Sequence, residues 1–368
     1  MLFALSIGLA GAGVALAAYL QHPKFGALPA GERLVRIERS PHFIDGEFQN
    51  LVATPMFADD RSFLSVLVSN LVADKPARVT PAARVPTVKT DLKALDVAED
   101  TVIWLGHSTY FVQIGGKRVL IDPDFSPSAA PVSFSTRAFE GTSLYRVDEL
   151  PQIDYLLITH DHWDHLDHAT VTALRPKVKH VVSGLGVGAY FEQWGYDVAQ
   201  IHEADWFDAL ETGDGLTLHL LPARHYAGRL LTRNKTLWVG FVLELGGRRL
   251  LFSGDTGPGP HFEQIAQKFS GFDLVALDMG QYDTRWPYIH MTPEEAAQAA
   301  ETLGARALLP AHLGKFSIAR HAWDEPFERI AAASEGKPYR LLTPMIGEPV
   351  RLTDETQRFA RWWRGVAR

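Results

Sequence analysis

The segment 159–165 reads Thr-His-Asp-His-Trp-Asp-His and directly follows an apolar run. The run, with the threonine that ends it (155–159), has the composition of a buried strand. Alternation along an extended backbone places His160 and His162 on one side. The chain must then turn, so Asp164 and His165 can face a second position nearby. This spacing predicts a metal site at the end of a strand.

The composition limits which ions and partners this site can serve. The chain has no cysteine, which excludes thiolate metal sites, disulfides and a cysteine nucleophile. Imidazole and carboxylate donors suit Zn²⁺, Mn²⁺ or Fe. Lys and Arg number 36 against 43 Asp and Glu, a net charge of −7. No overall positive field attracts nucleic acid, and we expect no nucleic-acid partner.

Short β-rich runs recur from residue 100 onwards, first in succession and later separated by helical segments. Gly115-Gly116 and Gly246-Gly247 each separate two such runs and predict hairpins. Thr292-Pro293-Glu294-Glu295 predicts a capped helix that ends near Gly304. The predicted strands are 101–105, 109–114, 118–122, 155–159, 179–182, 216–221, 237–245, 249–253, 274–277 and 307–309, with a short helix at 169–174. This order favours an α/β chain of two packed sheets with helices outside.

The N-terminal segment differs from the rest of the chain. Residues 1–20 carry no charged side chain and are almost wholly apolar. As a helix they would extend about 30 Å, the thickness of a bilayer core. We expect a membrane anchor or an export (periplasmic) signal, with a buried helix as the alternative. Residues 21–99 are broken by prolines and predict an arm that wraps the domain formed by residues 100–368.

Three further donors lie behind predicted strands: His225 after 216–221, Asp255 after 249–253 and His312 after 307–309. With the segment 160–165, they resemble the signature of the metallo-β-lactamase superfamily. The resemblance implies a four-layer αββα sandwich and a dinuclear site at one sheet edge. It assigns His160, His162 and His225 to metal one, and Asp164, His165 and His312 to metal two, with Asp255 bridging. Two divalent ions, Zn²⁺ above all, would then lower the pKa of a shared water to generate a hydroxide nucleophile.

A narrower resemblance covers most of the chain after the apolar segment. Residues 22–26, 104–109, 120–123, 281–286, 290–295 and 312–316 resemble the branch that contains N-acylphosphatidylethanolamine-hydrolysing phospholipase D, and more distantly the ascorbate-6-phosphate lactonases. The chain departs from the phospholipase pattern at Lys315 and in 277–282. The resemblance implies a phosphodiesterase acting on a phospholipid. The alternatives are a lactonase for a phosphorylated sugar acid and, from another class, a non-catalytic membrane-associated scaffold.

Several residues around the predicted ions have two interpretations each. Asp164 either orients the attacking water or only binds metal. His290 is expected to contact the substrate phosphate or protonate the leaving group. Asp122 either accepts a hydrogen bond from a ligand imidazole or only forms a turn, and His107 is either functional or structural. The C-terminal run 358–364 alternates arginine with large aromatics, and packing of its tryptophans onto the domain is preferred to contact with lipid.

Overall fold

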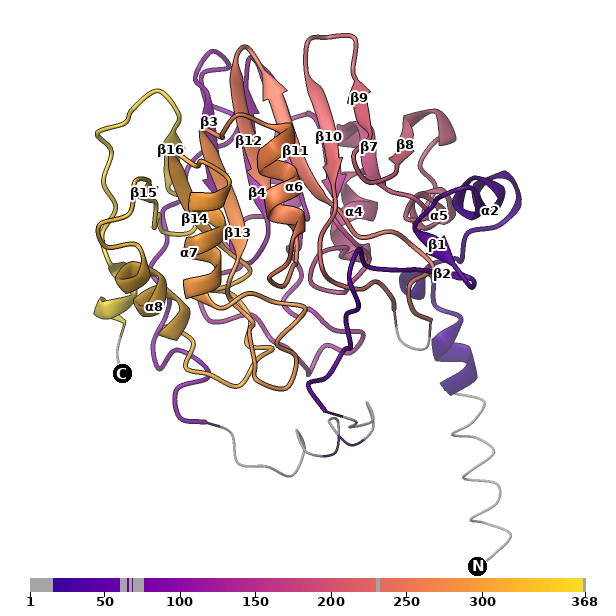
Figure 1. Ribbon diagram of the computed structural model, residues 1–368, viewed down its shortest axis with the longest axis horizontal. Helices are drawn as coiled ribbons and strands as arrows, with labels where there is room; N and C mark the ends of the chain where they lie inside the picture. Colours follow the sequence, from indigo (N-terminus) through magenta and orange to yellow (C-terminus); the bar gives the residue numbers. More distant parts are fainter. Residues whose placement is uncertain (1–15, 60–64, 66–67, 69–75, 230–231, 367–368) are drawn as a thin grey trace, which may run out of the picture.

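The computed structural model describes residues 16–59, 65, 68, 76–229 and 232–366 of the chain. Two seven-stranded sheets pack face to face, and helices cover their outer sides (Figure 1). The predicted α/β fold of two packed sheets with helices outside is therefore confirmed.

The first sheet has the strand order β16-β3-β4-β5-β6-β7-β8. Its first part is an antiparallel meander, and β5 to β8 run parallel. Gly115 and Gly116 have φ values of 52° and 76°, which the tight hairpin between β4 and β5 requires. The strands are β3 (Thr101–Trp104), β4 (Tyr110–Ile114), β5 (Lys117–Ile121), β6 (Ile153–Ile158), β7 (Val178–Gly184), β8 (Ile201–Ala204) and β16 (Pro349–Arg351).

The second sheet has the order β15-β14-β13-β12-β11-β10-β9. Strands β12 to β15 run parallel, and β9 to β12 form an antiparallel meander. Its strands are β9 (Ala209–Glu211), β10 (Thr217–Leu221), β11 (Gly240–Leu245), β12 (Arg248–Phe252), β13 (Leu274–Asp278), β14 (Ala307–Ala311) and β15 (Arg340–Leu341). The predicted strand 237–245 begins only at Gly240, because Leu237 and Val239 donate instead to carbonyls of Leu185 and Thr159 beside the first sheet.

Helices connect the parallel strands on the outer sides. α4 (His168–Leu174) and α5 (Gly188–Gln193) cover the first sheet, and α6 (His261–Lys268), α7 (Pro293–Thr302) and α8 (Glu325–Ala333) cover the second (Figure 1). α7 begins as predicted: the Thr292 hydroxyl accepts from the Glu295 amide, and the Glu295 carboxylate accepts from Thr292. The remaining short helices are η1 (Pro23–Phe25), η2 (Val147–Glu149), η3 (Arg175–Lys177), η4 (Val198–Gln200) and η5 (Trp362–Gly365).

The apolar core follows the alternation of the strands. Val102 and Trp104 face the space between the sheets, whereas Ile103 and Leu105 belong to a second cluster under α4 and α5. Both faces of the sheets are thus buried, which leaves loops at the strand ends as the places where polar side chains can gather.

The arm comprises η1, α2 (Gly31–Glu38) and the hairpin β1 (Phe43–Ile44) and β2 (Glu47–Phe48). Arg33 pairs with Glu203 of β8 at 2.8 Å, and the Phe48 amide donates to Asn234. Residues 1–15 of the predicted anchor lie outside the described residues. Among the residues that are described, no helix combines the length and apolar character needed to cross a bilayer.

The C-terminal tryptophans pack onto the domain, as preferred from the sequence. Trp362 is 7% exposed and Trp363 is 1% exposed. The Trp363 ring stacks on Phe327 of α8 at 5.0 Å.

Candidate metal centre

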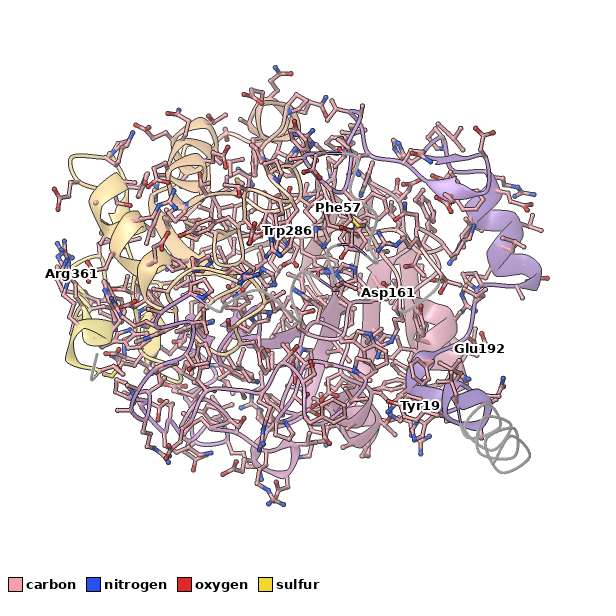
Figure 2. The ribbon with its side chains drawn as sticks, turned by 90° about the horizontal axis from the view of Figure 1, so that it is seen from below. Tyr19, Phe57, Asp161, Glu192, Trp286 and Arg361 are labelled. Carbon is pink, nitrogen blue, oxygen red and sulfur yellow. The ribbon has the colours of Figure 1, made fainter. Side chains whose placement is uncertain are left out.

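One edge of the sandwich collects the loops that follow the carboxyl ends of β5, β6, β10, β12, β13 and β14. Figure 2 shows the molecule from below, with Asp161 and Trp286 towards its middle and Tyr19 and Arg361 near its two ends. Every predicted ligand lies on one of these loops. All seven converge, although they come from four separate stretches of sequence.

The first donor group contains His160, His162, His225 and Asp255, whose ligand atoms lie within 4.8 Å of one another. His162 Nδ1 lies 2.9 Å from His160 Nε2 and 3.3 Å from His225 Nε2. Three nitrogens bound tetrahedrally to one Zn²⁺ at about 2.0–2.1 Å would be separated by about 3.3 Å. The spacing of the imidazoles therefore fits one shared ion.

Hydrogen bonds behind the rings fix which nitrogen faces the group. His225 Nδ1 donates to the Ile289 carbonyl at 3.0 Å, which leaves Nε2 to bind. The Thr159 hydroxyl donates to Asp122 and therefore accepts from His160 Nδ1 at 2.9 Å. The side chain of Asn50 in the arm pairs with both the amide and the carbonyl of His225. Nothing in the sequence signalled the role of Asn50, which depends on the path of the arm.

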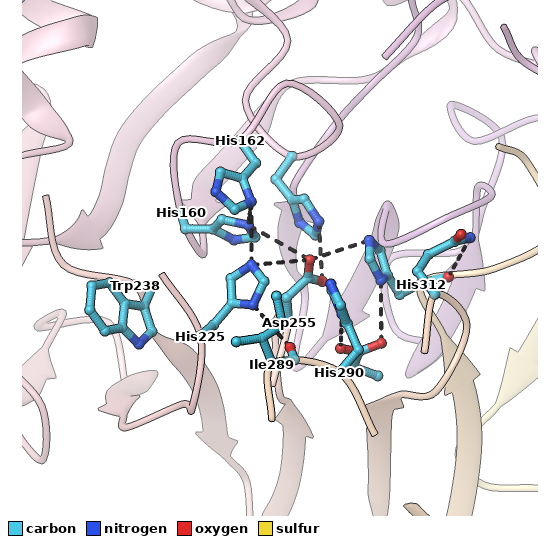
Figure 3. A network of polar contacts seen from close by, with 12 residues as sticks. His160, His162, His225, Trp238, Asp255, Ile289, His290 and His312 are labelled. Carbon is cyan, nitrogen blue, oxygen red and sulfur yellow. Dashed lines mark hydrogen bonds and ion pairs between the residues drawn. The ribbon is translucent and has the colours of Figure 1, made fainter. Parts of the chain in front are cut away.

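The second donor group contains Asp164, His165 and His312, and the structure adds His107. His312 Nε2 lies 3.1 Å from Asp164 Oδ2 and 3.2 Å from Asp255 Oδ2. His165 Nε2 lies 3.2 Å from Asp255 Oδ1. Figure 3 shows Asp255 between the rings of the first group and that of His312. Asp255 thus lies between the two groups, and its role as a bridging ligand remains a prediction.

Buried polar atoms that make no hydrogen bond indicate whether the two donor groups suit metal ions. Within the described residues, His162 Nε2, His165 Nε2 and Asp255 Oδ1 are buried and make no hydrogen bond, although the last two atoms face each other as an ion pair at 3.2 Å. A buried polar atom without a partner costs about 1–3 kcal/mol. His165 Nε2 and Asp255 Oδ1 both face the second group, where a bound cation would satisfy them. The donor set contains only imidazole and carboxylate, which suits divalent zinc, manganese or iron.

The pKa values separate the two groups. Burial lowers the pKa of His162 to about 4 and that of His160 and His225 well below the usual value, so these rings are neutral at pH 7. Burial opposes the charged form of His312 too, yet the carboxylates of Asp255 and Asp278 raise its pKa to about 10. The pKa of His165 is likewise raised, against burial, by Asp255 and Asp164. Protons on His165 and His312 balance the negative charge of the neighbouring carboxylates. A bound cation would replace these protons.

Two buried carboxylates support the second group from behind. Asp122 accepts from His165 Nδ1 at 2.8 Å and from the Thr159 amide at 2.8 Å. The structure therefore supports the hydrogen-bonding interpretation of Asp122. Asp278 accepts from His290 Nδ1 at 2.7 Å and lies 3.3 Å from His312 Nδ1. Asp278 was missed, although it follows the predicted strand 274–277 as Asp255 follows 249–253.

Other polar side chains lie in or near the two donor groups or in the same loops. His107 is fully buried, and its Nε2 lies 2.8 Å from Asp164 Oδ2. The His290 ring stacks on His312 at 5.0 Å, so it borders the second group. Arg285 is paired with Asp283 at 2.6 Å. His168 is the first residue of α4 and lies outside both groups.

Comparison with known proteins agrees with this geometry. Residues 117–313 match the model of the family described as the beta-lactamase superfamily domain. An uncharacterised protein of Mycobacterium tuberculosis is 39% identical over 344 residues, 92% of this chain and 91% of that protein. An N-acyl-phosphatidylethanolamine-hydrolyzing phospholipase D of Caenorhabditis elegans is 32% identical over 228 residues, 58% of this chain and 64% of that protein.

Among solved structures, the metallo hydrolase Igni18 of Ignicoccus hospitalis superposes with a TM-score of 0.54 at 21% identity, covering 68% of this chain and 97% of that one. This likeness concerns the fold, and it confirms the sandwich expected from the resemblance. All seven predicted ligands lie within residues 117–313, the region that matches the family model. The chain belongs to the metallo-β-lactamase superfamily and is a metal-dependent hydrolase of that superfamily.

Proposed function

We propose that the protein is a dinuclear phosphodiesterase that hydrolyses a phospholipid of the N-acylphosphatidylethanolamine type. The observation that carries this proposal is the position of Asp255, which belongs to the first donor group and lies 3.2 Å from both His165 and His312 of the second, where each group has enough donors to hold one ion. A non-catalytic scaffold has no need of seven converging donors with unsatisfied buried atoms.

Two ions bound in these groups would supply an activated water and positive charge at the phosphate. The water oxygen adds to phosphorus, the bond from phosphorus to the ethanolamine oxygen breaks, and phosphatidic acid and N-acylethanolamine are released. The departing oxygen needs a proton. His290 lies beside the second group and is the candidate proton donor, and we assign to Asp164, a member of that group, the role of orienting the water or accepting its proton.

A cavity of about 910 Å³ opens beside His290 and supports a substrate larger than a small metabolite. Its lining combines rings with guanidinium groups and includes Tyr282, Arg285, His290, Arg320, His321 and Arg329. Because cations are balanced here by carboxylates such as Asp283 and Glu325, the cavity suits a polar headgroup with one or two negative charges. The C. elegans relative, whose name states this phospholipid, points to the same class.

Zn²⁺ is the ion we propose, with Mn²⁺ or Fe as the alternatives. The three neutral imidazoles of the first group are the donors that zinc prefers at about 2.0–2.1 Å. Metal analysis of the purified protein by plasma mass spectrometry should give two ions per chain, predominantly zinc.

We further propose that residues 1–20 bring the enzyme to a membrane or direct its export to the periplasm. The sequence of these residues is apolar, and Leu16 and Leu20 are 58% and 36% exposed where the described chain begins. Flotation of the full chain with phosphatidylcholine vesicles should recover it in the lipid fraction. Recovery in the lipid-free fraction, together with the absence of cleavage in cells, would exclude both roles.

The decisive assay measures phosphatidic acid released from N-acylphosphatidylethanolamine by zinc-loaded protein. The panel also contains an unrelated phosphodiester and a phosphorylated sugar lactone. His162→Ala should abolish turnover and keep the circular dichroism spectrum, because the metal edge is not the core. His168→Ala, a histidine outside both groups, is the matched control and should retain activity. Lactone turnover without phosphodiester turnover would favour the lactonase.

A further inference from the structure

Residues 312–319, called here the His312 loop, begin in an unfavourable backbone conformation. His312 has a φ of 62°, which L-residues with large side chains adopt only when the surroundings impose it. Its amide donates to the His107 carbonyl at 3.2 Å, and the His107 amide donates to Leu313 at 3.1 Å. These two bonds fix one side of the loop and leave the rest to be held by side chains.

Gln281 holds the loop from the second sheet. Its side-chain nitrogen donates to the carbonyls of His312 and Phe316 at 3.3 and 3.2 Å. Its side-chain oxygen accepts from the amides of Ile318 and Ala319, both at 2.9 Å. The side chain is 3% exposed, so a single buried amide makes four bonds to one loop. Gly280 permits this approach, since a Cβ there would lie 1.8 Å from the His312 oxygen.

Lys315 ties the same loop to the first sheet. The residue is 1% exposed, and its ammonium group donates to the backbone carbonyl of Asp124 and interacts with the Asp124 carboxylate. Asp124 is also buried and lies two residues beyond Asp122, which orients His165. A buried lysine is rare unless it is paired, so this contact is a specific link between the loops after β14 and β5.

We propose that Gln281 and Lys315 are positioning residues that set the distance between His312 and the His165 side of the second donor group. His312 belongs to the second sheet, whereas Asp164 and His165 follow β6 of the first. An ion held by both sides requires their spacing to be correct within a few tenths of an ångström. Gln281 fixes the loop to its own sheet, and Lys315 fixes it to the turn that supports His165. The inference rests on the proposed two-metal centre.

The first donor group has a separate set of supports. The Asp161 carboxylate accepts from the Gly228 amide at 2.6 Å and from the hydroxyl groups of Tyr190 and Thr236 at 2.7 and 3.1 Å. These bonds connect the loop of His160 and His162 to that of His225 and include neither Gln281 nor Lys315. The contacts of Gln281 and Lys315 with the His312 loop are together called the clamp. Loss of the clamp should therefore weaken binding of the second ion and leave binding of the first ion unchanged.

The test is a titration of the metal-free full chain with Co²⁺ or Zn²⁺ against a competing chelator, which gives one dissociation constant for each ion. His162→Ala and His312→Ala identify which constant belongs to which group. Gln281→Met and the charge-compensated pair Lys315→Met with Asp124→Asn remove the clamp. Gln200→Met and Lys177→Met are matched controls. Gln200 donates to the carbonyls of Val178 and Lys179 at the start of β7, and Lys177 donates to those of Val147, Asp148 and Leu150 before the start of β6, whereas the donors 160–165 follow the end of β6.

We expect each clamp variant to raise the dissociation constant of the second ion by about 10–100-fold, as loss of a supporting contact typically does. The constant of the first ion and both constants of the controls should not change. An unchanged second constant, or equal weakening of both ions, would overturn the inference, even if the melting temperature fell. Wild-type protein that binds fewer than two ions would instead refute the two-metal centre, and the clamp with it.

Discussion

Asp255 belongs to the first donor group and contacts the second, but the two groups are built by different means. The first group relies on burial: its three imidazoles are neutral, and bonds to Thr159 and Ile289 orient His160 and His225. The second group relies on charge, because carboxylates surround His165 and His312 and raise their pKa values. The neutral imidazoles of the first group are ready to bind zinc without losing a proton. The second group has an excess of carboxylate charge, which must be balanced by protons or by a bound cation. The comparison teaches that one site of a pair can be ready for its ion while the other exchanges protons for it.

Backbone strain is also divided unevenly between the groups. His107, Asp122 and His312 have φ values of 55°, 43° and 62°. All three lie in or directly behind the second group, and none of the histidines of the first has a positive φ. Strained conformations persist only where neighbouring contacts impose them. We therefore expect the second group to be the more sensitive to changes in its supports.

The largest effect should come from the bridge. Asp255→Ala removes the carboxylate that both groups share, so both ions should be lost. Several kcal/mol of transition-state stabilisation depend on the ions, which corresponds to a fall in kcat/KM of about 10³-fold or more. Turnover of the proposed phospholipid and metal content, measured on the same sample, check this. Retention of one tightly bound ion would mean that the first group functions without Asp255.

The next effect should divide the two groups. Asp278→Asn removes a negative charge behind His312 and His290, and should weaken the second ion by about 10–100-fold. The first ion should keep its affinity, because the ring nitrogens of its histidines are oriented by Thr159 and a backbone carbonyl. Chelator competition gives both constants. The matched comparison is Asp154→Asn, a carboxylate that pairs with Lys179 at the other end of β6 and should change neither constant.

How far the sequence predicted this site depends on whether a feature is local. His160, His162, Asp164 and His165 form one short motif, and His225, Asp255 and His312 each follow a strand that apolar alternation indicates. Asp278 also follows a predicted strand. Its pairing with His290 could not be deduced, because that contact depends on the path of the loop that leads into α7. Asn50 and Gln281 act on backbone atoms of distant loops, and no residue pattern specifies such contacts. The fold was predictable because strands, Gly-Gly hairpins and the cap at Thr292 are all local features.

The number of protons released on metal binding should differ between the two donor groups, because only the second holds protonated histidines. At pH 7 the ring of His162, with its pKa near 4, has no proton to lose, whereas His312, with a pKa of about 10, has one. Binding of the first ion should release no proton from its histidines, and binding of the second should release at least one. The affinity of the second ion should therefore rise about tenfold per pH unit for each displaced proton between pH 7 and 10. Calorimetry in buffers of different ionisation enthalpy counts these protons, and equal release in the two steps would contradict the division.

The smallest effect should distinguish a ligand from a support within the second group. His107 lies close enough to the other donors to bind the ion, but its Nε2 is already engaged with Asp164 at 2.8 Å. If the ring only orients that carboxylate, His107→Gln can replace the donor, and kcat/KM should fall by about fivefold or less, equivalent to about 1 kcal/mol. A ligand would behave differently, because glutamine is a poor substitute for imidazole at zinc. Loss of the second ion in His107→Gln, measured as metal content, would place His107 among the ligands and make the second group as rich in histidine as the first.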